Sequence, residues 1–466
     1  MLTYDLEKEK GRFLYEKLYS AIKRDIIARK IRSGERLPSK RALSEHLHIS
    51  KVTVESAYAR LCDEGICRAE TKRGYFVSNA LPPVATSSFD DVEADVGDRS
   101  GKREKYEIDF CSNAISSAQF PFSVWSHLMR SVILDYGCEL LASSDKTGAL
   151  ILKRAICEYL LKTRGMNVLP EQIIIGAGSE YLYGLLSSLL PTGAVIGVED
   201  PGYGAISKSY ELSGKRVKYI PLDGEGISVF DLYASGADVL HISPGHHFPS
   251  GKITSSHRRE EIGKWLCKDK KRLIIEDEYD TEFRQNGAYQ MPLATIFPQR
   301  VIYLNTFSKT ISPSLRIAYM VLPQDYLKKY NEKMGFLSCT VPAFEQYTLA
   351  KFIEGGYFER HIGRRRRELA LIRELVMNAI STYFPPKKYR IEEENAGTHF
   401  LLCIECADED GIRKNLERAG VHILFESDYT VECEKSRGKL IMNYTGLDKN
   451  EVDFAIKALS SAIFEK

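Results

Sequence analysis

The 466-residue sequence has no long apolar run. No stretch approaches the 18 consecutive apolar residues that a membrane-spanning helix needs, so we expect no membrane partner. The first ten residues, MLTYDLEKEK, are charged and lack the apolar core of a secretory signal. These two absences predict a cytoplasmic protein.

Cysteine is too sparse for a disulfide-rich scaffold, because only ten cysteines are scattered over the whole length. A chain of this size without an export signal is expected to keep such residues as reduced thiols. We therefore expect neither a disulfide framework nor a metal site.

A strong net charge is also absent, because the formal net charge at pH 7 is only +2. The charge is unevenly distributed, however. Residues 1–75 hold 17 Lys and Arg against 11 Asp and Glu, a difference of +6. A basic segment joined to a nearly neutral remainder is typical of a protein with one end that faces nucleic acid.

Three segments of different character follow one another along the chain, whose length suits two or three domains. Residues 10–78 are dense in helical pattern, and residues 108–466 alternate between strand-like and helix-like runs. Between them, residues 79–107 hold paired prolines, small polar residues and charges of both signs, which leave little to bury. This segment predicts a flexible linker with an r.m.s. span of roughly 30 Å.

The C-terminal segment predicts an α/β domain. Six short runs, rich in β-branched and other apolar residues, are QIIIGAG, AVIGVED, DVLHIS, RLIIEDEYD, VIYLNTFSK and IAYMVLP. Their apolar middles suit strands that are covered on both faces, and amphipathic stretches lie between several of them. The alternation predicts a largely parallel sheet, followed over roughly the last 85 residues by a small α+β segment.

The N-terminal segment predicts three helices. The first is expected over about residues 9–29, with apolar residues at helical spacing: Leu14, Leu18, Ile22, Ile26 and Ile27. Ser39 is the expected N-cap of a short helix over residues 40–46, and Ser50 that of a third helix that ends at Gly65. The residues of the third helix expected in the core are Val54, Ala57, Tyr58 and Leu61.

The third helix is then expected to present basic and hydroxyl groups, because Lys51, Thr53 and Arg60 face outward. Two short helices joined by a tight turn, the second with such a surface, are typical of a helix-turn-helix. The segment RAETKRGYFVSN adds a wing-like pair of strands with its tip at residues 72–74. The alternative is a three-helix interaction module with a solvated basic face.

The stretch SGERLPSKRALSEHLHISKVTVESAYARLCDEGICRAETKRGYFV closely resembles the winged helix-turn-helix of the GntR family of bacterial transcription regulators. The phrases SGERLPSKRALS and SKVTV carry the resemblance. Lys51 stands where the family usually has Arg, which keeps the charge and loses the bidentate fork. The resemblance implies an N-terminal all-α winged helix-turn-helix that binds double-stranded operator DNA. The residues it implies for DNA contact are Arg41, Lys51, Thr53, Lys72, Arg73 and Gly74.

A second group of residues suits pyridoxal phosphate, whose aldehyde needs a lysine amine that is at least partly neutral. Lys309 in NTFSKTISPSLRIAYM is the candidate lysine. Asp277 and Tyr279, two apart at a predicted strand end, leave the same face of the strand. Asp277 can pair with the pyridine nitrogen and Tyr279 can donate to the phenolic oxygen, while Tyr203 in EDPGYGA can stack on the ring.

The phosphate of that cofactor needs backbone N–H groups at a helix N-terminus and a cation. The segment IIIGAGSEYLYGLL reads as strand, glycine-rich turn and helix, so Gly178, Ser179 and Glu180 can present N–H groups. Arg316 can clamp the phosphate, and Ser308 lies beside it. Each motif alone is usually a plain turn or a solvated surface. Their joint occurrence at the carboxyl ends of predicted strands favours a ligand site.

Residues 108–460 resemble class I aminotransferases of fold type I. SPGHHFPSG is similar to the N-P-x-N-P-T-G region of that family, and NTFSKTISPSLRIAYMVLP to its lysine segment. The two resemblances together are typical of MocR/GabR-type regulators. They imply a fold type I, PLP-dependent aminotransferase-like domain with a small α+β C-terminal subdomain, and a homodimer.

The sequence departs from that family where a substrate carboxylate is often held. The family's arginine in L-R-L-G-F corresponds to Ile441 in KLIMNY, and an arginine of some relatives corresponds to Ala205. Arg437 and Lys439 are nearby candidates for the same task. Without both arginines, a simple ω-amino acid held in the usual manner is disfavoured. Another amino compound, or the cofactor itself, stays open as the effector.

These observations predict a PLP-dependent transcriptional regulator in which an amine effector replaces Lys309 at the cofactor aldehyde and shifts the DNA-binding geometry. The alternative is a working aminotransferase with an appended helical domain. A basic run, GRRRRELALIREL over residues 363–375, is interpreted as a charged helix of the aminotransferase-like domain rather than a nucleic-acid surface.

Overall fold

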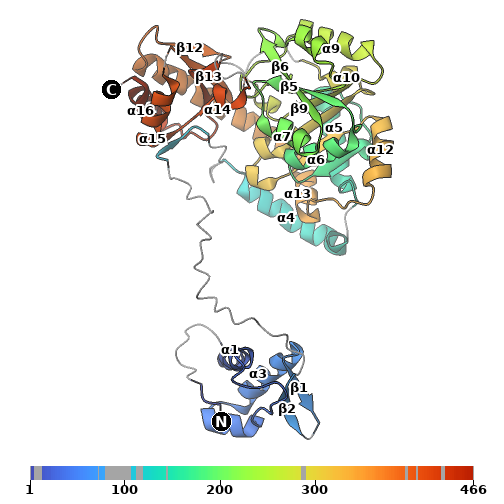
Figure 1. Cartoon of the computed structure of the whole chain (residues 1–466), viewed down its shortest axis with the longest axis vertical. Helices are drawn as coiled ribbons and strands as arrows, with labels where there is room; N and C mark the ends of the chain where they lie inside the picture. Colours follow the sequence, from blue (N-terminus) through green and yellow to red (C-terminus); the bar gives the residue numbers. More distant parts are fainter. Residues whose placement is uncertain are drawn as a thin grey trace. The chain divides into compact units, whose positions relative to one another are not determined.

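The computed structural model describes residues 2–4, 13–71, 73–78, 106–111, 119–142, 145–284, 290–393, 397–405, 408–431 and 436–464. The chain divides into two compact units, residues 1–102 and 103–466 (Figure 1). Each unit has a hydrophobic core of its own, so we describe them separately. The predicted linker, residues 79–107, lies outside the described residues except for residues 106 and 107.

The smaller unit contains the three predicted helices, α1 (Leu14–Ile27), α2 (Lys40–Leu47) and α3 (Lys51–Asp63). Both predicted caps are confirmed, because Ser39 accepts from the backbone N–H of Ala42 and Ser50 accepts from that of Thr53. The α3 residues predicted to face the core are all buried. The helices thus end and turn where short polar side chains satisfy free N–H groups.

The prediction for the apolar face of α1 was partly wrong. Leu18, Ile22 and Ile26 are buried, but Leu14 is 41% exposed and Ile27 is 43% exposed. Leu14 is the first residue of the helix and Ile27 the last, so neighbouring elements cover them less. Residues 5–12, where the helix was expected to begin, lie outside the described residues.

A two-stranded antiparallel hairpin follows α3, made of β1 (Cys67–Glu70) and β2 (Gly74–Val77). Its inner end joins the helical core through Cys67 and Val77, and Leu37 donates its N–H to the carbonyl of Tyr75. The unit is therefore a helix-turn-helix with a β-wing packed on it, as predicted.

The larger unit is built on an eight-stranded sheet in the order β4-β11-β10-β9-β8-β5-β6-β7. Its strands are β4 (Ile173–Gly176), β5 (Val195–Asp200), β6 (Arg216–Asp223), β7 (Gly226–Ile227), β8 (Val239–Ile242), β9 (Leu273–Glu278), β10 (Val301–Thr306) and β11 (Ala318–Val321). All six predicted strands are present. The strands β10, β9, β8, β5 and β6 are mutually parallel, and β11 runs antiparallel to both of its neighbours.

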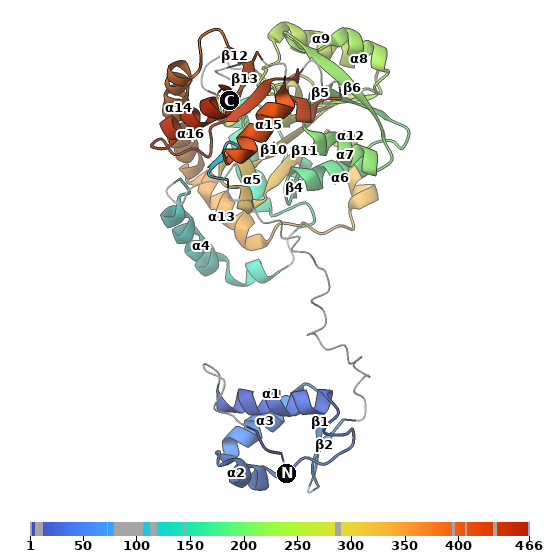
Figure 2. The same cartoon turned by 60° about the vertical axis from the view of Figure 1, so that its left-hand side comes forward.

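Helices cover both faces of this sheet, so its strands are apolar on both sides (Figure 2). One core joins alternate strand residues such as Ile274 and Tyr303 to α5 (Leu150–Arg164), α9 (Ser256–Lys268) and α13 (Ala343–Glu354). The second core joins the residues between them, such as Ile275 and Ile302, to other helices. These helices are α6 (Ser179–Leu189), α7 (Gly204–Leu212) and α12 (Gln324–Met334).

The C-terminal part forms the predicted α+β subdomain. Its sheet has the order β12-β13-β16-β15, with β12 (Tyr389–Glu392), β13 (His399–Ile404), β15 (Leu424–Phe425) and β16 (Lys439–Asn443). Long α14 (Tyr357–Tyr383), α15 (Glu409–Arg418) and α16 (Val452–Phe464) belong to the same part of the chain. The remaining α-helices of the unit are α4 (Phe122–Tyr136), α8 (Val229–Ser235), α10 (Leu293–Ile296) and α11 (Phe307–Thr310). The remaining strands, β3 (Ile108–Asp109) and β14 (Val421–His422), form a separate parallel pair.

The basic run over residues 363–375 lies in α14, and its arginines make contacts inside the unit. Arg365 is buried and pairs with Glu368, while Arg366 donates to the carbonyl of Glu282. These contacts agree with the interpretation of the run as part of the fold. No helix among the described residues is long and apolar enough to cross a membrane. The eight described cysteines carry free thiols, including Cys403, which stands at C-x-x-C spacing from the undescribed Cys406.

Candidate functional site

A cavity of about 590 Å³ opens at the carboxyl ends of the parallel strands. Eight of the nine residues predicted to bind the cofactor line it: Ser179, Glu180, Tyr203, Asp277, Tyr279, Ser308, Lys309 and Arg316. The ninth, Gly178, lies against the Arg316 side chain. Residues from β9, α6, α11 and the turn after β5 therefore meet in one place, as the strand-end argument predicts.

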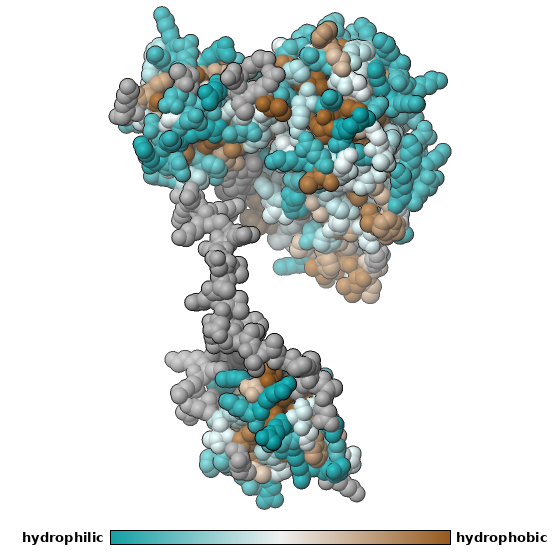
Figure 3. Space-filling model, viewed as in Figure 1, coloured by the Kyte–Doolittle hydropathy of each residue, from teal (hydrophilic) through white to brown (hydrophobic). Residues whose placement is uncertain are grey.

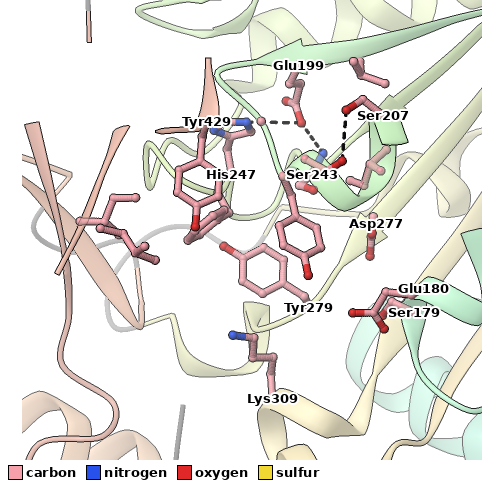
Figure 4. A pocket seen from close by; sticks show the side chains of 18 of the residues that line it. Ser179, Glu180, Glu199, Ser207, Ser243, His247, Asp277, Tyr279, Lys309 and Tyr429 are labelled. Carbon is pink, nitrogen blue, oxygen red and sulfur yellow. Dashed lines mark hydrogen bonds and ion pairs between the residues drawn. The ribbon is translucent and has the colours of Figure 1, made fainter. Parts of the chain in front are cut away.

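Lys309 lies on the short helix α11, directly after β10. Its side chain projects into the cavity toward Tyr279 (Figure 4). The cavity leaves the side chain accessible, but the surrounding protein limits hydration of the amine. Burial lowers the pKa of Lys309, and the Asp280 carboxylate opposes this by raising it. A lowered pKa increases the fraction of neutral, nucleophilic amine.

The turn before α6 is built around Gly178, which has a φ of +95°. A Cβ atom on Gly178 would lie 2.5 Å from Nη2 of Arg316, so only glycine leaves room for the guanidinium. That guanidinium donates to Oε2 of Glu180 over 2.8 Å. Ser308 contributes a buried hydroxyl that has no hydrogen-bond partner among the described residues. The N-terminus of α6, a guanidinium and this hydroxyl thus line the same cavity.

Asp277 lies at the end of β9, on the same side of the cavity as Ser179 and Glu180 (Figure 4). Its carboxylate is buried and accepts a 2.5 Å hydrogen bond from the hydroxyl of Tyr183. Nε2 of His241 lies 3.5 Å from the same carboxylate oxygen, Oδ2. These neighbours hold Asp277 in one orientation, as a carboxylate that must pair with a ring nitrogen requires.

The two predicted aromatic residues differ in burial. Burial raises the pKa of Tyr279 well above its usual value, so its hydroxyl stays protonated and able to donate. Tyr203 is 42% exposed and packs edge-on against Phe248, with ring centroids 6.1 Å apart. Tyr203 therefore forms part of the cavity wall rather than of the core.

Sequence reasoning missed a buried polar network beside Tyr279. Nδ1 of His246 lies 2.6 Å from a carboxylate oxygen of Asp280, and the Thr398 hydroxyl donates to the other oxygen. The His246 ring stacks on Tyr279 with centroids 5.7 Å apart. The signal was present in GHHFP and DEYD, but the contacts join segments 34 and 118 residues apart.

A second buried pair was also missed. Burial raises the pKa of Glu199 to about 8 and lowers that of His247 to about 3. Nε2 of His247 lies 3.7 Å from Glu199, whose Oε2 also accepts from the backbone N–H of Ser243. At neutral pH, Glu199 is therefore largely protonated and His247 is uncharged. The pair gives this wall of the cavity polarity without net charge.

The residues predicted to contact DNA lie on α2, α3 and the wing. Arg41 is 84% exposed at its side chain and pairs with Glu45 over 2.9 Å. Lys51 is exposed at the first turn of α3, the turn expected to enter the major groove. Thr53 is partly buried, and its hydroxyl lies 2.8 Å from Oγ of Ser50. Thr53 thus takes part in capping α3.

At the wing, Gly74 has a φ of +111°, and a Cβ atom there would lie 3.2 Å from Nε of Arg36. Arg73 is exposed and pairs with Glu70 over 2.7 Å. Lys72 lies outside the described residues. The described side chains of Arg41, Lys51 and Arg73 are exposed to solvent. Exposed cationic side chains are what contacts with DNA phosphates require.

Known protein families match both units of the chain. Residues 14–77 match the family described as bacterial regulatory proteins, gntR family, and residues 105–459 match aminotransferase class I and II. An archaeal alanine:glyoxylate aminotransferase has a similar structure, with a TM-score of 0.70, 23% identity, and coverage of 82% of this chain and 96% of that one. The larger unit is thus a fold type I aminotransferase-like domain.

Full-length relatives share both units. The chain is 33% identical to the HTH-type transcriptional regulator YdeL of Bacillus subtilis, over 96% of each protein. It is 27% identical to the probable rhizopine catabolism regulatory protein MocR of Rhizobium meliloti, over 96% of this chain and 93% of that one. It is 26% identical to the pyridoxine biosynthesis regulator PdxR of Corynebacterium glutamicum, over 94% of each. The chain belongs to the MocR/GabR-type transcriptional regulators, which join a GntR helix-turn-helix to an aminotransferase class I and II domain.

Proposed function

We propose that this transcriptional regulator binds pyridoxal phosphate in the cavity around Lys309, and that occupancy of the cavity controls operator binding through residues 10–78. One observation carries the proposal. A lysine whose pKa is lowered, an oriented carboxylate and a guanidinium at a helix N-terminus all meet in a single cavity. These are the three groups that an aldehyde, a pyridine nitrogen and a phosphate require.

The residues present fit the cofactor. The Ser308 hydroxyl, which has no partner among the described residues, and the Arg316 guanidinium, for which Gly178 leaves room, suit a phosphate. Asp277 would pair with the ring nitrogen, and the protonated Tyr279 would donate to the phenolic oxygen. Lys309 would hold the aldehyde. When bound, the cofactor supplies an electrophilic carbon with which an effector amine can react.

A homodimer is part of the proposal, as is the division into residues 10–78, a linker at 79–107 and an effector domain at 108–466. Large apolar side chains are exposed on α4 and the turn after it: Phe122, Ile133, Leu134 and Leu141. Figure 3 shows apolar surface over this end of the larger unit. A second copy of the chain is a suitable cover for such a surface.

We expect binding of the regulator to its operator to change when the cavity is filled. The test measures affinity for DNA from upstream of its own gene, with cofactor-free protein, with pyridoxal phosphate, and with the cofactor plus primary amines. A change with the cofactor alone identifies the cofactor as the signal. Identical affinity in every arm would refute the proposal.

The second candidate, a working aminotransferase, is favoured by one observation, because eight of the nine residues predicted to bind the cofactor line the cavity around Lys309. Steady conversion of an amino acid and a keto acid would support it. DNA binding that ignores cavity occupancy, together with such turnover, would establish that function in place of sensing.

Asp277→Asn should weaken binding of pyridoxal phosphate by about 10-fold or more, because a charge-assisted hydrogen bond contributes roughly 1.5–3 kcal/mol. The amide keeps the shape of the side chain and removes its charge. The dissociation constant is read from a titration of the protein's visible absorbance. Asp428→Asn is the matched control, because Asp428 also lines the cavity but pairs with Arg413. An equal loss in both variants would contradict the assigned role.

A further inference from the structure

We infer that the effector of this regulator is a primary amine with an uncharged apolar or aromatic tail, and that it carries no carboxylate. The inference rests on the proposed function and specifies its ligand. It concerns the wall of the cavity formed by the C-terminal subdomain and the segment around Phe248, which we call the effector wall. Its described residues are Phe110, Phe248, Thr398, His399, Leu424, Asp428, Tyr429, Thr430, Val431, Ile441 and Asn443, of which Asp428 is paired with Arg413.

Ile441 belongs to one apolar cluster with three other residues of this wall, Phe248, Leu424 and Tyr429. It is 2% exposed, on β16, and it lines the cavity together with Asn443 two residues on. The two cationic residues considered for this position point elsewhere. Nζ of Lys439 lies 3.0 Å from Glu426, and Arg437 lies 3.9 Å from Asp410. Neither lines the cavity.

Aromatic rings form much of the remaining effector wall. Phe248 packs edge-on against Tyr429, with centroids 4.9 Å apart, and against His399 at 5.4 Å. Leu424 and Phe110 add apolar surface. Such a surface binds a hydrophobic or aromatic tail by removing it from water.

Two of the three described histidines that line the cavity provide no compensating charge, because burial lowers the pKa of both His399 and His247 to about 3 and leaves them neutral at physiological pH. The third, His241, lies on the cofactor side of the cavity, 3.5 Å from the Asp277 carboxylate. Among the described residues that line the cavity, the lysine and arginine side chains are those of Lys208, Lys309 and Arg316. Lys309 and Arg316 are assigned to the cofactor. Lys208 is exposed and follows Ser207, which lies across the cavity from Tyr429 (Figure 4).

A carboxylate on the effector wall would therefore lose its hydration without gaining a cation from the described residues. Burial of an unpaired charge is strongly unfavourable, whereas an uncharged tail carries no such penalty. Exchange of Lys309 for the effector at the aldehyde carbon would be balanced. One carbon–nitrogen double bond would break as another forms, and every hydrogen that the incoming ammonium nitrogen loses would end on the lysine nitrogen, which would be released as an ammonium. No oxidant or reductant is consumed.

The test compares each amine with the amino acid that differs from it by a carboxylate. Full-length protein loaded with pyridoxal phosphate is titrated with phenethylamine and L-phenylalanine, and with isoamylamine and L-leucine. The visible absorbance of the cofactor and the affinity for DNA are both recorded. We expect each amine to act at a concentration at least about 10-fold below that of its amino acid, from a charge-pairing difference of roughly 1.5–3 kcal/mol.

Ile441→Arg should reverse this order by about 10-fold or more in favour of L-phenylalanine, because a guanidinium can pair with the added carboxylate. Ile441→Leu is the matched control and should keep the order of the unaltered protein. Lys208→Ala should also keep the order of the unaltered protein. That result would show that the preference for amines comes from the effector wall and not from the Lys208 cation across the cavity. If Ile441→Arg does not fold, the comparison of each amine with its amino acid on the unaltered protein still tests the inference.

Two results would overturn the inference. One is unaltered protein that responds to an amino acid as well as to its amine. The other is a cofactor spectrum that responds to neither, which would point to the cofactor itself as the signal. Both leave the proposed function standing, because the visible band is still present. A protein that never acquires the band would instead refute the proposed function.

Discussion

The Lys309→Ala protein is expected to lose the visible absorbance band near ~420 nm that marks a pyridoxal phosphate aldehyde bound to an amine. Lys309 is the described lysine that projects toward Tyr279 at the centre of the cavity, and its lowered pKa favours the neutral amine. Borohydride reduction followed by mass spectrometry should show added cofactor mass on the unaltered chain and none on the variant. Residual cofactor can be held only through its phosphate and ring.

Lys208→Ala is the matched control for that experiment. Lys208 lines the same cavity, is exposed, and lies on α7 rather than beside Tyr279. Its replacement should leave both the absorbance band and the added mass unchanged. If the Lys309 variant kept the reduced adduct, another lysine would be the attachment point, and the role assigned to Lys309 would be wrong. DNA binding by the cofactor-free variant reports whether the chain still folds.

The double variant Arg41→Ala, Lys51→Ala is expected to bind operator DNA about 30-fold or more weakly, because two lost contacts at roughly 1–3 kcal/mol each sum to at least about 2 kcal/mol. Both side chains are exposed on the two helices of the helix-turn-helix. If both contact phosphates, the slope of log affinity against log salt should fall by about 2. Fluorescence anisotropy at several salt concentrations measures both quantities.

Lys30→Ala serves as the control for charge alone. Lys30 follows α1 in the same unit, outside α2, α3 and the wing in the sequence, and pairs with Asp25 over 3.3 Å. Its loss removes one exposed positive charge and should change affinity by less than about 5-fold, because an exposed ion pair is worth at most about 1 kcal/mol. Equal weakening by Lys30→Ala would mean that the protein attracts DNA by its net charge, without a defined recognition surface.

Local patterns in the sequence were sufficient to predict six of the eight strands of the large sheet. The runs IIIG, VLHI and IIED have apolar middles because both faces of these strands are covered, and all six predicted strands exist. β6 was missed. Most of its residues, RVKYIPLD, are exposed or only partly covered, and Ile220 alone is buried, as expected for a strand close to the sheet edge. A run that contains Lys and Pro and lacks a continuous apolar middle does not match the pattern of a buried strand.

The residues predicted to bind the cofactor could be grouped from the sequence because each lies at or just beyond the carboxyl end of a predicted strand, and parallel strands end on the same side of a sheet. The partners of these residues could not be derived in this way. The network of His246, Asp280 and Thr398 joins three separate segments, and its existence depends on how the C-terminal subdomain meets the sheet. The same limit explains why Lys439 remained a candidate until its contact with Glu426 was seen.

The ion pair between Arg316 and Glu180 has a consequence for how tightly the cofactor is held. The guanidinium that suits a phosphate already has a carboxylate partner 2.8 Å away, on the helix whose N-terminus faces the same position. An incoming phosphate must displace that carboxylate or share the cation with it, and the two anions repel each other. Glu180 is thus an intramolecular competitor that keeps affinity below what the guanidinium alone would give. Exchange with a dilute cellular pool, rather than permanent retention, is the behaviour this arrangement favours.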